Sequence, residues 1–114
     1  MTRKIILDCD PGHDDAVALL LAMGNPNIDL LGITTVGGNQ TLDKVSHNAR
    51  VVKEIAGHPE IPVYAGCDRP LVRPVEVAEA IHGSTGMDVE GVKFPQPSTA
   101  LADAHAIDFI IDTI

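Results

Sequence analysis

Short apolar runs of strand length alternate with helical patterns along this chain. Residues 4–10 begin with an apolar run that ends in acids, residues 28–36 finish on β-branched side chains, and residues 62–65 form a shorter run. Continuous rather than alternating hydrophobicity is typical of a strand that is covered on both faces, as in a parallel sheet. Glycine or proline follows each run, so the pattern predicts three separate strands.

Two helices are predicted between these strands. Residues 14–23 are rich in helix formers, start with two acids and are apolar nearly all round, which favours a helix buried on most sides. Residues 41–56 place apolar side chains at spacings of 3 and 4, with charged side chains on the other faces. This second pattern predicts an amphipathic helix that crosses from the second strand to the third.

The rest of the chain divides into a long loop and a final helix. Residues 66–97 contain four prolines and no regular pattern, and such segments are often active-site loops or lids. Residues 100–114 predict a helix, and no glycine, proline or basic last turn ends it. The order of elements predicts an open α/β fold with a mainly parallel sheet flanked by helices. We expect residues 1–114 to be the N-terminal part of a single α/β domain that continues beyond Ile114.

Composition and charge narrow the class of partner. The 114 residues include 16 acidic and 8 basic side chains, which gives a net charge of −8. Such a charge repels nucleic acid and anionic membrane surfaces, so we expect neither as a partner. The apolar run near the N-terminus stops at Asp8, which is too early for a signal peptide or a membrane span. Cys9 and Cys67 have no metal-ligand spacing, and reduced thiols suit the cytoplasmic location that we expect.

Four carboxylates are confined to the end of the first predicted strand: Asp8, Asp10, Asp14 and Asp15. Open α/β sheets bind ligands at the carboxyl ends of their strands. Like charges this close repel one another unless a cation lies among them, and oxygen-only ligands favour calcium or magnesium over zinc. The second strand ends in Gly-Gly-Asn-Gln at residues 37–40, so Asn39 is expected beside the acids. We therefore expect all five side chains to converge on one cavity.

Simpler interpretations of these motifs remain open from the residues alone. The acids can simply be solvated side chains at a strand end, with Asp14 and Asp15 interacting only with the dipole of the following helix. Residues 37–40 can be an ordinary turn between strand and helix. Phosphatases of the haloacid-dehalogenase type also carry Asp-x-Asp after a first strand. A non-catalytic module that binds divalent cations is a further alternative, although an EF-hand is excluded because His13 occupies the sixth loop position, where glycine is needed.

Three motifs in this order resemble the inosine-uridine-preferring nucleoside hydrolases. They are residues 8–16 (Asp-Cys-Asp-Pro-Gly-His-Asp-Asp-Ala), residues 33–41 (Ile-Thr-Thr-Val-Gly-Gly-Asn-Gln-Thr) and residues 81–86 (Ile-His-Gly-Ser-Thr-Gly). The resemblance covers nearly the whole chain, and its first motif is highly specific. It implies calcium-dependent hydrolysis of the N-glycosidic bond of ribonucleosides to ribose and free base. It also implies a homodimer or homotetramer of the full-length protein.

The resemblance assigns roles to five residues. Asp10 is implied to be both a calcium ligand and the general base that activates a metal-bound water, and Asp15 a second calcium ligand. Asp14 is implied to hold a ribose hydroxyl, Asn39 to orient groups around metal and sugar, and His82 to contact substrate. The remaining calcium ligands and the leaving-group acid of the family lie beyond Ile114, so the chain alone is expected to be inactive.

The other histidines carry no comparable signal. A surface position in a glycine-rich loop is an equally good interpretation of His82, and His13 is assigned no role. His47, His58 and His105 belong to no motif. The preferred base cannot be derived from these residues. A helix as apolar as residues 14–23 needs cover on several sides, so the chain alone is also expected to expose apolar surface.

Overall fold

The computed structural model describes all 114 residues and contains a three-stranded parallel sheet in the order β1-β2-β3. The elements along the chain are β1 (Arg3–Cys9), α1 (His13–Gly24), β2 (Ile28–Thr35), α2 (Leu42–Ile55), β3 (Val63–Ala65), α3 (Glu79–His82) and α4 (Ala106–Thr113). The open parallel α/β fold predicted from the sequence is therefore confirmed. The structure contains no helix whose length and apolar character would let it span a membrane.

The carboxyl ends of the strands are level with one another. Cys9 of β1 pairs with Thr35 of β2, and Thr35 pairs in turn with Ala65 of β3. Because parallel strands in this register end at the same edge of the sheet, the residues that follow β1 and β2 emerge side by side. The fold thus brings together two polar segments that are separated by α1 in the sequence.

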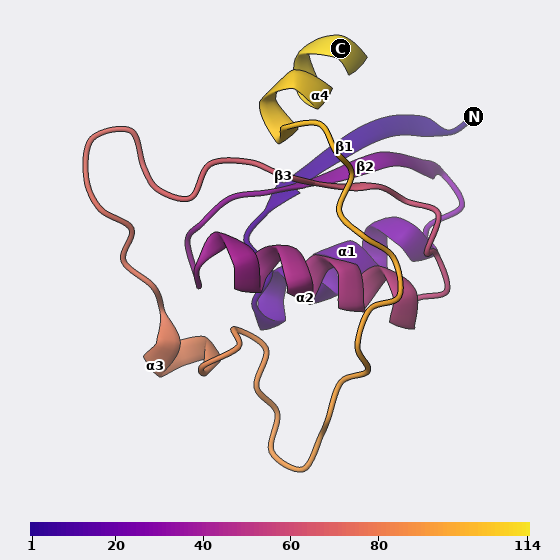
Figure 1. Cartoon of the computed structure of the whole chain (residues 1–114). Coiled ribbons are helices and arrows are strands. Elements are labelled where there is room, and N and C mark those ends of the chain that lie inside the picture. The colour runs from indigo at the N-terminus through magenta and orange to yellow at the C-terminus, as the bar shows by residue number, and fades with distance from the viewer.

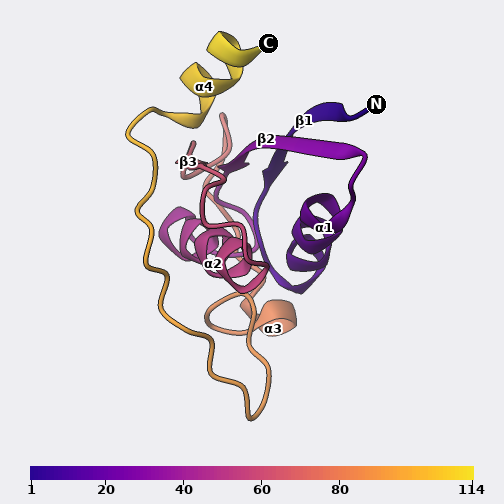
Figure 2. The same ribbon diagram turned by 90° about the vertical axis from the view of Figure 1, so that its right-hand side faces the viewer.

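Helices α1 and α2 lie on one face of the sheet, and α4 lies on the opposite side, near β3 (Figures 1 and 2). The core between sheet and helices includes Leu19 of α1, Ile33 of β2, Ala49 of α2 and Val63 of β3, all fully buried. These side chains come from the sheet and from the two helices on this face. The amphipathic pattern of α2 is confirmed, because its apolar stripe is the face that packs on the sheet.

The expected burial of the first helix on most sides is wrong for this chain. Leu19 and Ala22 are its buried residues, whereas Val17 is 64% and Leu21 69% exposed. The sheet and α2 cover one stripe of α1, and its outer face has no partner among the 114 residues. The related expectation that the chain exposes apolar surface is confirmed here and at α4, where Ile111 is 66% exposed.

The last helix is shorter than predicted. It begins at Ala106 rather than Ala100, because residues 100–105 are not helical. The backbone N–H of Ala102 donates 2.9 Å to the carbonyl of Val63, which holds this segment beside β3. The ring of His105 then caps α4 by accepting a hydrogen bond from the N–H of Ile107 at 3.1 Å. A tertiary contact and a local cap together set the start of the helix.

The long segment between β3 and α4 contains only the short helix α3. The segment forms α3 near the N-terminal end of α2 and then runs back alongside α2 toward α4 (Figure 1). Arg50 of α2 donates 2.7 Å to the carbonyl of Thr99, and Glu54 accepts hydrogen bonds from Ser98. The segment is therefore fastened along α2, and its first part lies next to the acidic strand end.

Candidate active site

Asp10 and Asn39 are joined at the ends of β1 and β2. The backbone N–H of Asn39 donates 2.8 Å to Oδ2 of Asp10, and the Asn39 side-chain amide donates 3.0 Å to the carbonyl of Asp10. Gly38 allows this approach, since a Cβ at that position would collide with the Asp10 carboxylate. The pair is held in one orientation by two hydrogen bonds that come from the neighbouring strand end.

Asp15 belongs to the same cluster. Its Oδ2 accepts a hydrogen bond of 3.0 Å from the backbone N–H of Asp10, so the first turn of α1 folds back on the end of β1. Burial raises the pKa of Asp15, and the charges of Asp10 and Asp14 act in the same direction, against the hydrogen bond from the Asp10 backbone. A cation bound beside Asp15 would relieve the repulsion that its neighbouring carboxylates exert on it.

The other two acids are placed differently. Asp14 is exposed in the first turn of α1, next to Asp15 in sequence. Asp8 is also exposed, and its Oδ1 accepts a hydrogen bond of 2.6 Å from the hydroxyl of Thr34 on β2. Hydrogen bonds thus connect Asp10, Asp15 and Asn39, while Asp14 lies at the edge of the group and Asp8 is bound to the sheet.

The donor set fits part of a calcium site. Asp10 and Asp15 offer carboxylate oxygens, which a hard divalent cation prefers. The chain has no group of three or more His, Cys, Asp or Glu side chains arranged to hold a metal ion. A complete coordination sphere would therefore need ligands of another kind or from outside these residues.

Cys9 lies directly behind the acids but is unsuited to nucleophilic chemistry. Burial raises the pKa of its thiol, and the negative charges of Asp15, Asp8 and Asp10 raise it further. The sulfur points at the backbone carbonyl of Thr34, 3.8 Å away. The thiol stays protonated, so the reactive groups of this strand end are its carboxylates.

His82, at the end of α3, lies against the turn between Asp10 and Asp15. A Cβ on Gly12 would be only 2.7 Å from Nδ1 of His82. Nδ1 of His82 is 3.3 Å from Nδ1 of His13, and Nε2 of His13 is 2.8 Å from the carbonyl of Asp88. Because a carbonyl only accepts, Nε2 of His13 carries its hydrogen, and a neutral His13 ring then accepts from His82 through Nδ1.

The sequence interpretation assigned no role to His13, which the structure places in contact with His82. The two residues are 69 positions apart, and no periodic pattern or spacing links them. The one available signal was that His13 directly follows the Pro-Gly turn of the acidic motif. His47, by contrast, lies on α2 and lines a hollow that is separate from the acidic cluster.

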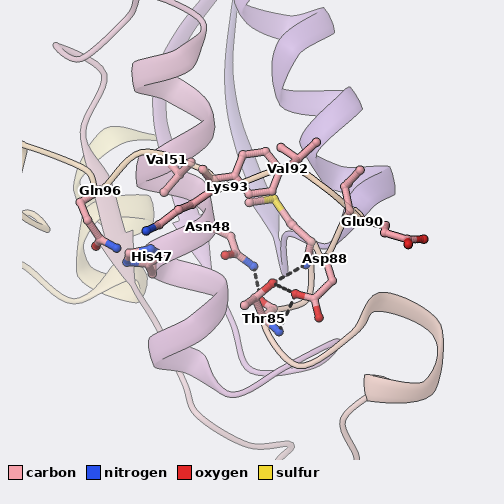
Figure 3. A pocket seen from close by; sticks show the side chains of 12 residues that line it. His47, Asn48, Val51, Thr85, Asp88, Glu90, Val92, Lys93 and Gln96 are labelled. Atoms are coloured by element: carbon pink, nitrogen blue, oxygen red, sulfur yellow. Dashed lines mark hydrogen bonds between the residues drawn. The ribbon is translucent and has the colours of Figure 1, made fainter.

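That hollow is a cavity of about 610 Å³ between α2 and the loop that follows α3 (Figure 3). It contains none of the residues of the acidic cluster. Its lining consists of His47, Asn48, Val51, Thr85, Met87, Asp88, Val89, Glu90, Val92, Lys93, Phe94 and Gln96. The acidic cluster and this cavity therefore share no residues.

Comparison with known proteins points to one family. The family described as inosine-uridine preferring nucleoside hydrolase matches residues 5–114. An inosine-uridine preferring nucleoside hydrolase of Leishmania major is 58% identical over the whole of this chain, which covers 36% of that protein. A pyrimidine-specific ribonucleoside hydrolase of Escherichia coli is 51% identical over 98% of this chain, which covers 35% of that protein.

A solved structure supports the same relationship. The purine-preferring ribonucleoside hydrolase from Gardnerella vaginalis superposes with a TM-score of 0.89 at 36% sequence identity, covering 97% of this chain and 36% of that one. The chain thus spans about a third of the length of the relatives it matches.

Proposed function

Because this chain belongs to the inosine-uridine preferring nucleoside hydrolase family, we propose that it is the N-terminal part of an enzyme that hydrolyses ribonucleosides to ribose and free base. The observation that carries the proposal is the hydrogen-bonded group of Asp10, Asp15 and Asn39 at the ends of two adjacent parallel strands. This group would supply the general base and part of the metal site. The haloacid-dehalogenase alternative finds no support in this match, which assigns residues 5–114 to a nucleoside hydrolase family.

Asp10 is the proposed general base. It accepts a proton from the attacking water while that water's oxygen forms a bond to the anomeric carbon and the carbon–nitrogen bond breaks. The nucleobase leaves with the bonding electron pair, and we propose that the residue that protonates it lies outside these 114 residues. The backbone N–H of Asn39 holds Oδ2 of Asp10 and its side-chain amide holds the Asp10 backbone carbonyl, so the carboxylate is oriented while its other oxygen receives no hydrogen bond from Asn39.

Calcium is the proposed cofactor, held in part by Asp10 and Asp15. When bound, it would supply positive charge that lowers the pKa of a water and positions vicinal ribose hydroxyls. The raised pKa of Asp15 supports this assignment, since a cation would remove the repulsion that burial and neighbouring carboxylates create. Asp14, exposed beside Asp15, is proposed to accept a hydrogen bond from a ribose hydroxyl, and His82 to contact the substrate at the edge of the site.

Base preference is proposed to reside outside these residues. Relatives described as inosine-uridine preferring, pyrimidine-specific and purine-preferring all share this segment at 36–58% identity. The segment common to them would therefore bind ribose and metal. The exposed apolar faces of α1 and α4 are surfaces that the rest of the protein or a second copy would cover, and a homodimer or homotetramer remains our prediction.

The test is hydrolysis of inosine and of uridine by the full-length protein, with calcium and after treatment with a chelator. We expect turnover that the chelator removes and added calcium restores. A matched control is Asp43→Asn, which removes an acid from the exposed first turn of α2 and should leave turnover unchanged. Calcium binding without turnover would instead identify a non-catalytic cation-binding module.

A further inference from the structure

Three polar side chains, one just before α2 and two in its N-terminal half, hold the loop that follows His82. Lys44 and Asn48 are four residues apart on one stripe of α2, and Gln40 precedes the helix at the same spacing. They donate to the backbone carbonyls of three consecutive residues, 83–85: Gln40 to Gly83 and Ser84 at 3.4 and 3.0 Å, Lys44 to Ser84 at 2.8 Å, and Asn48 to Thr85 at 2.7 Å. These three side chains therefore hold the loop through its backbone carbonyls, while Met87 of the same loop packs in the hydrophobic core.

Asn48 differs from the other two because it also reaches the acidic motif. Its side-chain nitrogen donates 2.9 Å to the carbonyl of Pro11 and 2.7 Å to the carbonyl of Thr85. Both hydrogens of this amide are used, and Asn48 is only 2% exposed. Figure 3 shows the amide directed toward Thr85. One buried side chain thus connects two segments that lie on either side of it in the sequence.

The same two segments also touch directly. Gly12 faces His82 and the carbonyl of Gly86, which a Cβ at Gly12 would approach to 2.7 and 3.0 Å. Gly86 has a φ of +89° and packs on the Asn48 amide, which its own Cβ would approach to 3.1 Å. The Pro11–Gly12 turn, the Asn48 amide and the loop around Gly86 therefore form one close-packed contact.

We propose that Asn48 is a positioning residue for the active site. It fixes the separation between the Pro11–Gly12 turn, which lies between Asp10 and Asp15, and the loop that begins at His82. The proposal rests on the proposed function, because it gives His82 a defined place relative to the general base. Asn48 itself touches neither of those side chains and acts through the backbone of both segments.

The chemistry of the contact explains why an amide occupies this position. The buried carbonyl of Pro11 and the partly buried carbonyl of Thr85 need two hydrogens, and an asparagine nitrogen supplies both from one uncharged group. Leucine at this position would fill a similar volume but leave both carbonyls without a donor, and aspartate would direct a third acceptor at them. The contact should therefore depend on the hydrogens and not on the bulk of the side chain.

The test compares the full-length protein with Asn48→Leu, His82→Ala and the double variant, with Asp43→Asn as the control on the same helix. We expect Asn48→Leu to accelerate hydrogen exchange of residues 82–88 and to lower kcat/KM by about 10–10²-fold, the scale on which misplacement of a site residue acts. The kcat/KM of the double variant should be no lower than that of His82→Ala alone, because both changes remove the contribution that a correctly placed His82 makes to catalysis. A packing role would instead give additive losses.

A second variant covers the case in which Asn48→Leu fails to fold. Gly86→Ala disturbs the contact from the loop side, and we expect it to produce the same local acceleration of exchange and a similar loss of kcat/KM. Unchanged exchange of residues 82–88 in the folded variants would overturn the positioning role, whether or not nucleosides are hydrolysed. Faster exchange in a protein that hydrolyses no nucleoside would support that Asn48 holds the loop and would overturn the proposed function.

Discussion

The backbone N–H of Asn39 donates a hydrogen bond of 2.8 Å to Oδ2 of Asp10, which ties the end of β2 to the end of β1 through one carboxylate. A carboxylate that accepts a fixed hydrogen bond has one oxygen oriented and the other left for chemistry. The contact therefore orients the Asp10 carboxylate before any substrate binds, as its proposed role as general base requires. It also explains why the acidic motif and the Gly-Gly-Asn motif follow adjacent strands.

Replacement of Asp10 by asparagine tests this role in the full-length protein. The amide has nearly the same shape and can still accept the hydrogen bond from Asn39, but it cannot take a proton from water. We expect kcat to fall by about 10²–10⁴-fold, or roughly 3–5 kcal/mol of barrier, with a much smaller change in KM. Steady-state hydrolysis of inosine and uridine at saturating calcium measures both. Near-normal turnover would show that the general base is another group.

Gly38 is predicted to be needed for activity because its lack of a side chain leaves space for the Asp10 carboxylate. In Gly38→Ala the new methyl group would collide with the Asp10 carboxylate and push it off its hydrogen bond from Asn39. We expect a loss of kcat/KM of about 10²-fold, which is the cost of displacing a reacting group by about 1 Å. The control is Gly24→Ala at the end of α1, where a Cβ meets nothing within 4 Å and activity should not change. Equal activity of the two variants would contradict the prediction.

The parts of the fold that were predictable depend on local patterns. Continuous apolar runs closed by glycine or proline located β1, β2 and β3 to within a residue or two. The meeting of Asp10 with Asn39 was also predictable, because parallel strands in register end at the same edge of a sheet.

The parts that were missed depend on contacts between distant residues. The start of α4 is set by the pairing of Ala102 with Val63, which no helical propensity reveals. The contact of His13 with His82 and the bridge from Asn48 to Pro11 join segments 69 and 37 positions apart. Hydrogen bonds from side chains to loop carbonyls leave no periodic trace in the sequence.

Lys53 is predicted to contribute to stability through its ammonium group. It is 2% exposed, and its Nζ donates to the carbonyls of Pro59 and Ile61 at 3.0 and 2.6 Å. Burial lowers the pKa of this lysine, so its charge has a desolvation cost that the two hydrogen bonds must exceed. In Lys53→Met that cost disappears, but two carbonyls lose their donor.

For Lys53→Met we expect a net loss of about 1–3 kcal/mol in the free energy of unfolding, because leaving the buried carbonyl of Ile61 and the partly buried carbonyl of Pro59 without a donor costs more than the burial of the ammonium group. Denaturant unfolding of the full-length protein measures it. Lys4→Met, the same change at an exposed strand residue, is the control and should shift the free energy by less than about 0.5 kcal/mol. A Lys53→Met protein as stable as the control would mean that desolvation of the ammonium group cancels the gain from its hydrogen bonds.

Asp15 should make the stability of the protein depend on pH, and bound calcium should reverse that dependence. Burial and the neighbouring charges of Asp10 and Asp14 raise the pKa of Asp15 above its ordinary value of 3.8. Without calcium the folded state holds this proton more tightly than the unfolded state does. Asp15 therefore opposes folding increasingly as the pH rises from 3.8 through its raised value, which is the reverse of a salt-bridged acid. Calcium should remove this penalty, so its stabilising effect should be larger at pH 7 than at pH 4.5. Thermal unfolding of the full-length protein with and without calcium at the two pH values measures the effect.

The last prediction concerns the pH dependence of calcium binding itself. A proton and a calcium ion compete for the same carboxylate. Calcium affinity weakens as the pH falls and Asp15 takes up its proton. Because the pKa of Asp15 is raised, this weakening should begin at a higher pH than it would for an aspartate of ordinary pKa. Asp15→Asn should bind calcium more weakly, recover part of its activity in excess calcium and lose most of this pH dependence. Calcium titrations of the wild type and of Asp15→Asn across the same pH range measure the difference. If Asp15→Asn kept the pH dependence of the wild type, the titrating ligand would be another carboxylate of the cluster.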